Sequence, residues 1–182
     1  MQGTWTNRRR IITLVILSVS LGILVLVDML TKKYFVNLFL EKGNTVVIKD
    51  FFYFTYVQNK GSAFGFMASV SWGQLFFKIF TAFSLAMFIA FLVYSMLKNK
   101  LLLSISLVLI ISGAIGNYID RLAFGYVRDF IGFTFGNYNF PIFNFADTCL
   151  TIGAIIFFIN FLFFDEQALF KKNGTKTNNS DQ

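Results

Sequence analysis

The stretch LLLSISLVLIISGAIGNYI, residues 101–119, contains no charged side chain and is followed at once by Asp120 and Arg121. A helix that crosses a bilayer needs roughly 17–25 mainly apolar residues, so this stretch is long enough to span a membrane. Because a bilayer holds no water that could satisfy backbone N–H and C=O groups, the stretch must be helical. It therefore predicts a transmembrane helix with charged residues at one end.

Three further apolar runs surround this helix in the sequence, and the composition agrees with a membrane protein. The chain of 182 residues is 56% hydrophobic and 14% charged, whereas soluble domains carry about 25% charged residues. We expect one polytopic domain over residues 1–182, an all-α membrane protein with four transmembrane helices. The expected spans are residues 11–30, 75–97, 101–120 and 146–166, each approximate at its ends.

The first apolar run follows three arginines, so it could instead be a cleaved signal peptide. It extends from Ile11 to Val27, which is longer than the apolar region of about 7–15 residues in most signal peptides. The charged residue Asp28 follows it, in place of a small-residue cleavage site. We therefore expect a retained span.

Basic residues beside the spans predict the orientation of the chain. Arg8–Arg10 precede the first span, Lys98 and Lys100 lie between the second and third, and Lys171 and Lys172 follow the fourth. With four spans these sites share one side, which the positive-inside rule assigns to the cytoplasm, although the first outer loop also contains several lysines. We expect both termini to be cytoplasmic. Anionic lipid head groups account for the net charge of +7, so we expect membrane lipids and no nucleic acid as partners.

The first outer loop, expected between Asp28 and Lys78, is rich in β-branched and aromatic residues that are typical of strands. We expect a small sheet, called here the β-cradle, within about residues 43–66, on the outward-facing surface of the membrane that the helices span. A short amphipathic segment around Ala63–Phe66 would lead toward the second span. The polar tail, residues 173–182, is expected to be disordered.

The second outer loop, residues 120–147, contains three aspartates, Asp120, Asp129 and Asp147. Carboxylates beside a bilayer are costly to keep charged, so they indicate function by default. The chain has no histidine and one cysteine, which excludes Ser-His and Cys-His hydrolases and histidine-based zinc sites. We therefore expect no metal and no cofactor, and acid–base chemistry performed by carboxylates, with Lys and Tyr as lesser candidates.

Two neighbouring carboxylates can hydrolyse an amide bond. Their repulsion at about 4 Å is roughly 4 kcal/mol at an effective dielectric constant of about 20, or about three pKa units, so one keeps a proton while the other is ionised. The residues alone do not decide which two of Asp28, Asp120, Asp129 and Asp147 form such a pair. Structural roles compete, because Asp28 is spaced for a helical salt bridge, Asp120 adjoins an arginine, and Asp147 suits a helix N-terminus.

Four strings, in this order and spacing, resemble the motifs of the lipoprotein signal peptidases (type II signal peptidases), which are aspartic proteases of the bacterial inner membrane. The strings are Asn59-Lys60-Gly61-Ser62-Ala63-Phe64, Gly116-Asn117-Tyr118-Ile119-Asp120-Arg121, Gly125-Tyr126-Val127-Arg128-Asp129-Phe130 and Phe143-Asn144-Phe145-Ala146-Asp147. A further string, Asp28-Met29-Leu30-Thr31-Lys32, resembles the Asp-Gln-x-x-Lys motif of the family, with Met29 in the place of Gln.

The resemblance implies a catalytic pair, Asp129 and Asp147, near the outer face of the bacterial inner membrane. It implies that the enzyme cuts signal peptides from prolipoproteins on the N-terminal side of a cysteine that carries diacylglycerol, and that globomycin-type cyclic peptides inhibit it. It also implies a set of residues that bind substrate or support the site. These are Asp28, Lys32, Asn59, Gly61, Asn117, Asp120, Arg121 and Asn144.

Two other classes of protein fit four spans with aspartates at the membrane edge. A proton-coupled carrier could use Asp28, Asp120, Asp129 and Asp147 as a relay, but transporter sites usually lie near the bilayer midplane, and no span has a charge in its middle. A purely structural four-helix protein would leave the aspartate cluster unexplained. The peptidase is the interpretation that accounts for the cluster.

Overall fold

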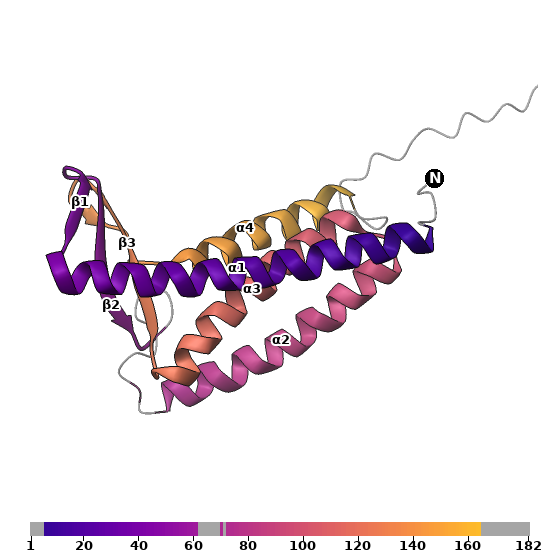
Figure 1. Cartoon of the computed structure of the whole chain (residues 1–182), viewed down its shortest axis with the longest axis horizontal. Helices are drawn as coiled ribbons and strands as arrows, with labels where there is room; N and C mark the ends of the chain where they lie inside the picture. Colours follow the sequence, from indigo (N-terminus) through magenta and orange to yellow (C-terminus); the bar gives the residue numbers. More distant parts are fainter. Residues whose placement is uncertain (1–5, 62–69, 71, 165–182) are drawn as a thin grey trace, which may run out of the picture.

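The computed structural model describes residues 6–61, 70 and 72–164, and it contains helices and one small sheet (Figure 1). In chain order the elements are α1 (Asn7–Lys42), β1 (Thr45–Ile48), β2 (Phe52–Asn59), α2 (Gly73–Leu97), α3 (Leu101–Ala123), β3 (Val127–Phe135), β4 (Tyr138–Asn139) and α4 (Phe145–Ile159). A π-helical turn, η2 (Asn160–Phe164), continues α4. The amphipathic segment expected around 63–66 and the tail 173–182 lie outside the described residues.

The four long helices form the expected all-α membrane architecture, and each is long and apolar enough to cross a bilayer. Their outer surfaces expose many Leu, Ile, Val and Phe side chains, as a lipid environment allows. The helix α3 lies at the centre of the bundle. Its Leu107 is fully buried, and the core around it takes side chains from all three other helices.

The helix α1 is longer than the sequence predicted. It begins after Thr6, whose side chain accepts a hydrogen bond from the backbone N–H of Arg9, and it ends only at Gly43, where φ is +70°. The helix includes the expected first span, residues 11–30, and the expectation of a loop that starts at Asp28 is wrong because the chain stays helical to Lys42. The additional turns persist because they are packed, with Phe35 stacked between aromatic rings of the sheet at 4.1 and 4.5 Å.

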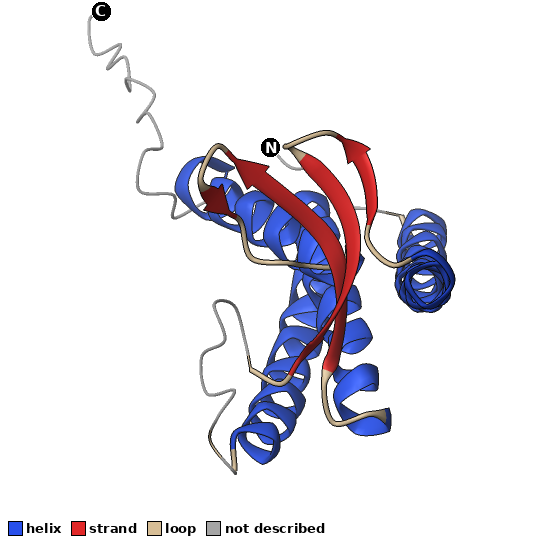
Figure 2. Cartoon of the chain, turned by 90° about the vertical axis from the view of Figure 1, so that its left-hand side faces the viewer, coloured by secondary structure: helices blue, strands red, loops and turns tan. Residues whose placement is uncertain are grey.

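The β-cradle is antiparallel, with the strand order β1-β2-β3-β4, and Figure 2 shows it lying across one end of the helices. The prediction of strands in the first outer segment is confirmed for β1 and β2. The sheet is not confined to that segment, because β3 and β4 belong to the second outer segment, which the sequence analysis treated as a loop. Two strands alone are marginally stable, and pairing with β3 gives β2 its second neighbour.

The register of β2 on β3 brings the two outer segments together. Val57 pairs with Asp129 and Asn59 with Val127, after an irregularity between Phe54 and Val57. Phe52 stacks on a ring of β3 at 4.9 Å, so aromatic contacts reinforce the pairing. This pairing places Asp129 beside the end of β2, where the string that begins at Asn59 starts.

Small residues allow the helices to approach closely beneath the sheet. A Cβ atom on Gly113 would lie 3.1 Å from the backbone nitrogen of Leu150, and one on Gly153 would lie 2.9 Å from the backbone nitrogen of Ile110. Close approach through small residues is a common way for membrane helices to pack. It brings the ends of α3 and α4 that lie beneath the sheet, and the polar side chains on them, close together.

Candidate active site

The ten residues singled out from the sequence gather at the end of the bundle that the sheet covers. They lie on α1 (Asp28, Lys32), β2 and its end (Asn59, Gly61), α3 (Asn117, Asp120, Arg121), β3 (Asp129) and the start of α4 (Asn144, Asp147). Most of their side chains are buried. Segments far apart in the sequence therefore build one polar cluster at the edge of an apolar bundle.

Asn144 connects Asp129 with Asp147. It caps α4, where its side-chain oxygen accepts a hydrogen bond from the backbone N–H of Asp147 at 3.0 Å, and its own backbone N–H donates to Asp147 Oδ2 at 3.1 Å. Its Nδ2 donates to Asp129 Oδ1 at 2.6 Å. The helix-capping role expected for Asp147 is real, and the same contacts hold the two carboxyl groups around one fully buried amide.

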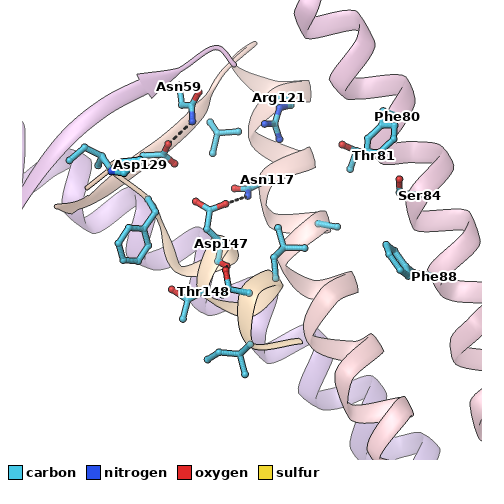
Figure 3. Close-up of a pocket in the computed structure, with 18 of the residues that line it drawn as sticks. Asn59, Phe80, Thr81, Ser84, Phe88, Asn117, Arg121, Asp129, Asp147 and Thr148 are labelled. Atoms are coloured by element: carbon cyan, nitrogen blue, oxygen red, sulfur yellow. Dashed lines mark hydrogen bonds between the residues drawn. The ribbon is translucent and has the colours of Figure 1, made fainter. Parts of the chain in front are cut away.

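Two further amides hold the carboxyl groups from opposite sides (Figure 3). Asn117 Nδ2 donates to Asp147 Oδ1 at 2.7 Å, and Asn59 Nδ2 donates to Asp129 Oδ2 at 2.9 Å. The oxygen of Asn59 in turn accepts from the backbone N–H of Gly61 at 2.9 Å. All four carboxyl oxygens of Asp129 and Asp147 therefore accept a hydrogen bond from a neutral N–H group.

A buried ion cluster supports these amides from α1 and α3. Lys32 Nζ lies 2.8 Å from Asp28 Oδ2 and 3.5 Å from Asp120 Oδ2, which confirms the helical salt bridge expected for Asp28. Asp28 also accepts from the backbone N–H of Ala146 at 2.9 Å. Asp120 does not pair with the arginine next to it; it pairs with Arg128, at 2.7 Å.

Arg128 is a site residue that the sequence reasoning missed. It precedes Asp129 on β3, and neighbouring side chains of a strand point to opposite faces. Asp129 therefore faces the amides while Arg128 faces Asp120 and lies over the ring of Phe124, with its guanidinium carbon 4.7 Å from the ring centre. The alternation of a strand was the available signal, but it could be used only once this segment was known to be a strand.

Burial and, to a smaller extent, the negative charge of Asp147 together raise the pKa of Asp129 to about 7. Hydrogen bonds from Asn59 and Asn144 and the charge of Lys32 act in the opposite direction without cancelling these effects. At neutral pH Asp129 therefore carries a proton in about half of the molecules. A group that can hold or release a proton at working pH is suited to general acid–base catalysis.

A cavity of about 830 Å³ opens beside the two carboxyl groups, between α2, α3 and α4. Asp129, Asp147, Asn117 and Arg121 lie at its polar end, and most of its remaining wall is apolar. Figure 3 shows one face of α2 across the cavity from these groups; the labelled residues on it are Phe80, Thr81, Ser84 and Phe88. No residue of α2 could be predicted as part of the site from the sequence, because this helix has no charged or motif residue on that face.

Within the described part of the chain, no three His, Cys, Asp or Glu side chains are grouped so that they could hold a metal ion. The arrangement instead offers a pair of carboxyl groups, oriented by amides, at the end of a cavity with apolar walls. Such a site can protonate and deprotonate a bound amide and water without any other group.

Comparison with known proteins assigns the family. The sequence profile of the family described as Signal peptidase (SPase) II matches residues 20–163. The chain belongs to the signal peptidase II family. It is similar to the lipoprotein signal peptidase of Clostridium tetani, with 41% identity over 145 residues, which is 79% of this chain and 89% of the relative. The lipoprotein signal peptidase of Syntrophus aciditrophicus is 34% identical over 151 residues, 82% of this chain and 93% of the relative.

A solved structure, described as a bacterial membrane enzyme determined by the in meso method at 1.9 Å resolution, has the same fold. The TM-score is 0.64 at 31% identity, over 89% of this chain and 97% of that one. As a signal peptidase II the chain is a multi-pass membrane peptidase. The resemblance described from the sequence motifs is thus confirmed at the level of the family.

Proposed function

We propose that Asp129 and Asp147 are the catalytic pair of this peptidase, which removes the signal peptide from prolipoproteins on the N-terminal side of a diacylglyceryl-modified cysteine. The observation that carries the proposal is Asn144, whose amide and backbone groups hydrogen-bond both carboxyl groups at the end of the cavity. Of the described carboxylates, these two line the cavity, whereas Asp28 and Asp120 are engaged by cations.

The chemistry follows from one proton shared by two carboxyl groups. The ionised member takes a proton from a water molecule, which attacks the carbonyl carbon of the scissile bond, while the protonated member donates to the carbonyl oxygen. The resulting diol collapses when a carboxyl group protonates the leaving nitrogen. The two groups titrate together, so the pair as a whole has two apparent pKa values.

The polar end of the cavity offers groups that would bind the extended substrate. Arg121 donates from Nη2 to the backbone oxygen of Gly61 at 3.2 Å, while its buried Nε has no hydrogen-bond partner among the described residues. That free N–H would suit a substrate carbonyl, and Asn59 also lines the cavity. Asp28, Lys32, Asn117, Asp120 and Asn144 would hold these groups and the catalytic pair in place.

The apolar part of the cavity would receive the lipid part of the substrate. Its wall between α2 and α4 is formed by side chains such as Phe88, Leu150 and Ile152, so acyl chains could remain in an apolar environment while the peptide reaches Asp129 and Asp147. Globomycin-type cyclic peptides would occupy the same cavity as inhibitors.

The location of the site supports a position near the outer face of the bacterial inner membrane. Arg8–Arg10 and the turn with Lys98 and Lys100 lie at the end of the bundle opposite the sheet (Figure 1). By the positive-inside rule that end faces the cytoplasm, together with both termini. The catalytic pair would then face the outer leaflet, where the lipidated cysteine lies.

The proposal is tested with a purified diacylglyceryl-modified prolipoprotein, whose cleavage is followed as a gel shift. Asp129→Asn and Asp147→Asn should each abolish turnover while they still bind a globomycin-type cyclic peptide. Asp50→Asn is the matched control, because Asp50 is exposed, and it should keep full activity. Full turnover in either Asp129→Asn or Asp147→Asn would remove the assignment of the pair.

A further inference from the structure

Lys32 is a fully buried lysine with hydrogen-bond acceptors on two sides. Its ammonium group donates to Asp28 Oδ2 at 2.8 Å and to Asn117 Oδ1 at 3.0 Å. An ammonium group has only donors, so the oxygen of the Asn117 amide must face Lys32. The nitrogen of that amide must then face Asp147, to which it donates at 2.7 Å.

The second amide of the site is oriented by an equally strict donor. The backbone N–H of Asp147 can only donate, and it points at the side-chain oxygen of Asn144 at 3.0 Å. The Nδ2 of Asn144 is therefore turned toward Asp129 Oδ1 and Asn117 Oδ1, at 2.6 and 3.1 Å. Neither amide can rotate by half a turn without setting two donors against each other.

The surroundings of the two aspartates differ in what they do to a negative charge. Asp147 lies in the first turn of α4, where the helix dipole favours an anion. It accepts from the amide of Asn117, which Lys32 polarises, and from the backbone N–H of Asn144. Asp129 lies on a strand without a helix terminus, and within the described residues the amides that contact it, those of Asn59 and Asn144, are not hydrogen-bonded to a cation.

We propose that Lys32 is a positioning residue that acts through Asn117: it keeps the negative charge on Asp147, which becomes the general base, and leaves the proton on Asp129, which becomes the general acid. The proposal rests on the proposed catalytic pair and adds the role of each member. Lys32 itself does not touch the reacting atoms.

The roles give a balanced reaction. In the first step the water oxygen bonds to the carbonyl carbon, the proton that it loses passes to Asp147, and the proton of Asp129 passes to the carbonyl oxygen. In the second step the C–N bond breaks, the leaving nitrogen takes the proton from Asp147, and one hydroxyl of the diol returns a proton to Asp129. Both carboxyl groups end in the state in which they began.

Other charged groups surround the pair and must be separated from the effect of Lys32. Arg121 acts on both aspartates from α3, and Asp28 and Asp120 flank the ammonium group. Arg128 belongs to the same ion cluster through Asp120, but among the described residues it makes no hydrogen bond to the Asn117 amide. Arg128 therefore offers a matched control: its loss removes a cation from the cluster and leaves the amide contacts in place.

The experiment measures kcat and KM against pH for three variants. Lys32→Met combined with Asp28→Asn removes one cation and one anion together, so no extra charge is left buried. Asn117→Leu removes the donor to Asp147 directly, and Arg128→Met is the control. In the first two variants the acidic limb of the profile should move to higher pH by about one unit or more, because a more alkaline medium is needed to ionise the base. In these two variants kcat should fall more than KM changes, and in Arg128→Met the limb should stay in place.

A second measurement covers variants with too little turnover for a profile. The infrared absorption of protonated carboxyl groups is titrated in each protein, and it should persist to higher pH in the Lys32 and Asn117 variants than in the native protein and in Arg128→Met. Unchanged titration in those two variants, or an equal shift in Arg128→Met, would overturn the role of Lys32. Asp129→Asn or Asp147→Asn with native turnover would instead refute the catalytic pair, so the two failures are distinguishable.

Discussion

Asp129 should reduce the stability of the folded protein at the pH at which it works, and Asp129→Asn should reveal this. The pKa of the carboxyl group is about 7 in the folded protein and 3.8 in an exposed aspartate. Between these values the folded state binds more protons than the unfolded state, so stability falls as the pH rises. The asparagine variant has no such proton, and its stability relative to the native protein should therefore rise with pH.

The magnitude follows from the same two values. From pH 5 to pH 7 the unfolded chain is almost fully ionised at this position, while the folded protein goes from protonated to half ionised, and each pH unit with a full difference of one proton costs about 1.4 kcal/mol. The stability difference should therefore change by about 2 kcal/mol in favour of Asp129→Asn across these two units. The asparagine must turn its NH₂ group toward Asn59 or Asn144, which costs about 1–3 kcal/mol at every pH. We expect the variant to be close to the native protein in stability at pH 5 and more stable than it at pH 8.

The single cysteine provides the assay. Cys149 is buried in α4, so a fluorescent maleimide reacts with it only as the protein unfolds, and the midpoint of thermal unfolding in detergent can be read at each pH. Asp50→Asn, the exposed control, should run parallel to the native protein. A difference between Asp129→Asn and the native protein that stays constant from pH 5 to pH 8 would refute the reasoning about the buried carboxyl group.

Three further predictions follow from individual contacts. Gly116→Ala would drive its Cβ into the carboxyl group of Asp28, whose Cγ would be only 2.9 Å away; disturbing this buried ion pair should reduce kcat/KM at least tenfold in the prolipoprotein cleavage assay. Above pH 7, kcat/KM should fall about tenfold per pH unit as Asp129 loses its proton. Asn59→Leu should move this alkaline limb to higher pH, because it removes a hydrogen bond that lowers the pKa of Asp129. Gly132→Ala should lower the stability of the folded protein by about 1 kcal/mol, measured as thermal midpoint, because the ring of Tyr53 covers the position of the new methyl group. In a protein that carries Tyr53→Ala, the same substitution should have no such cost.

Much of the fold could be predicted because its elements are local. The apolar runs required helices wherever they lay in a membrane, and the β-branched and aromatic residues of the first outer segment indicated β1 and β2. The extension of α1 to Lys42 and the pairing of β2 with β3 could not be predicted in this way. Both depend on contacts between distant segments, such as the stacking of Phe35 on Phe54 and Phe130.

The candidate site, like the fold, could be predicted only in part from the sequence. The absence of histidine and the grouping of Asp120, Asp129 and Asp147 indicated carboxylate chemistry, and the family motifs selected two of the three. They did not indicate that Asp120 would pair with Arg128, since that pair depends on which residues of the second outer segment alternate on a strand.

Hydrophobicity and residue type are properties of each position, so a four-helix membrane protein and its set of chemically active groups could be predicted from the order of the residues. Which of these groups meet became known from the folded chain: the carboxyl groups around Asn144, the amide that Lys32 orients, and the cavity whose far wall is α2. Contacts of this kind depend on the packing of separate segments. Their orientation follows from hydrogen-bond donors and acceptors that face each other only in the folded chain.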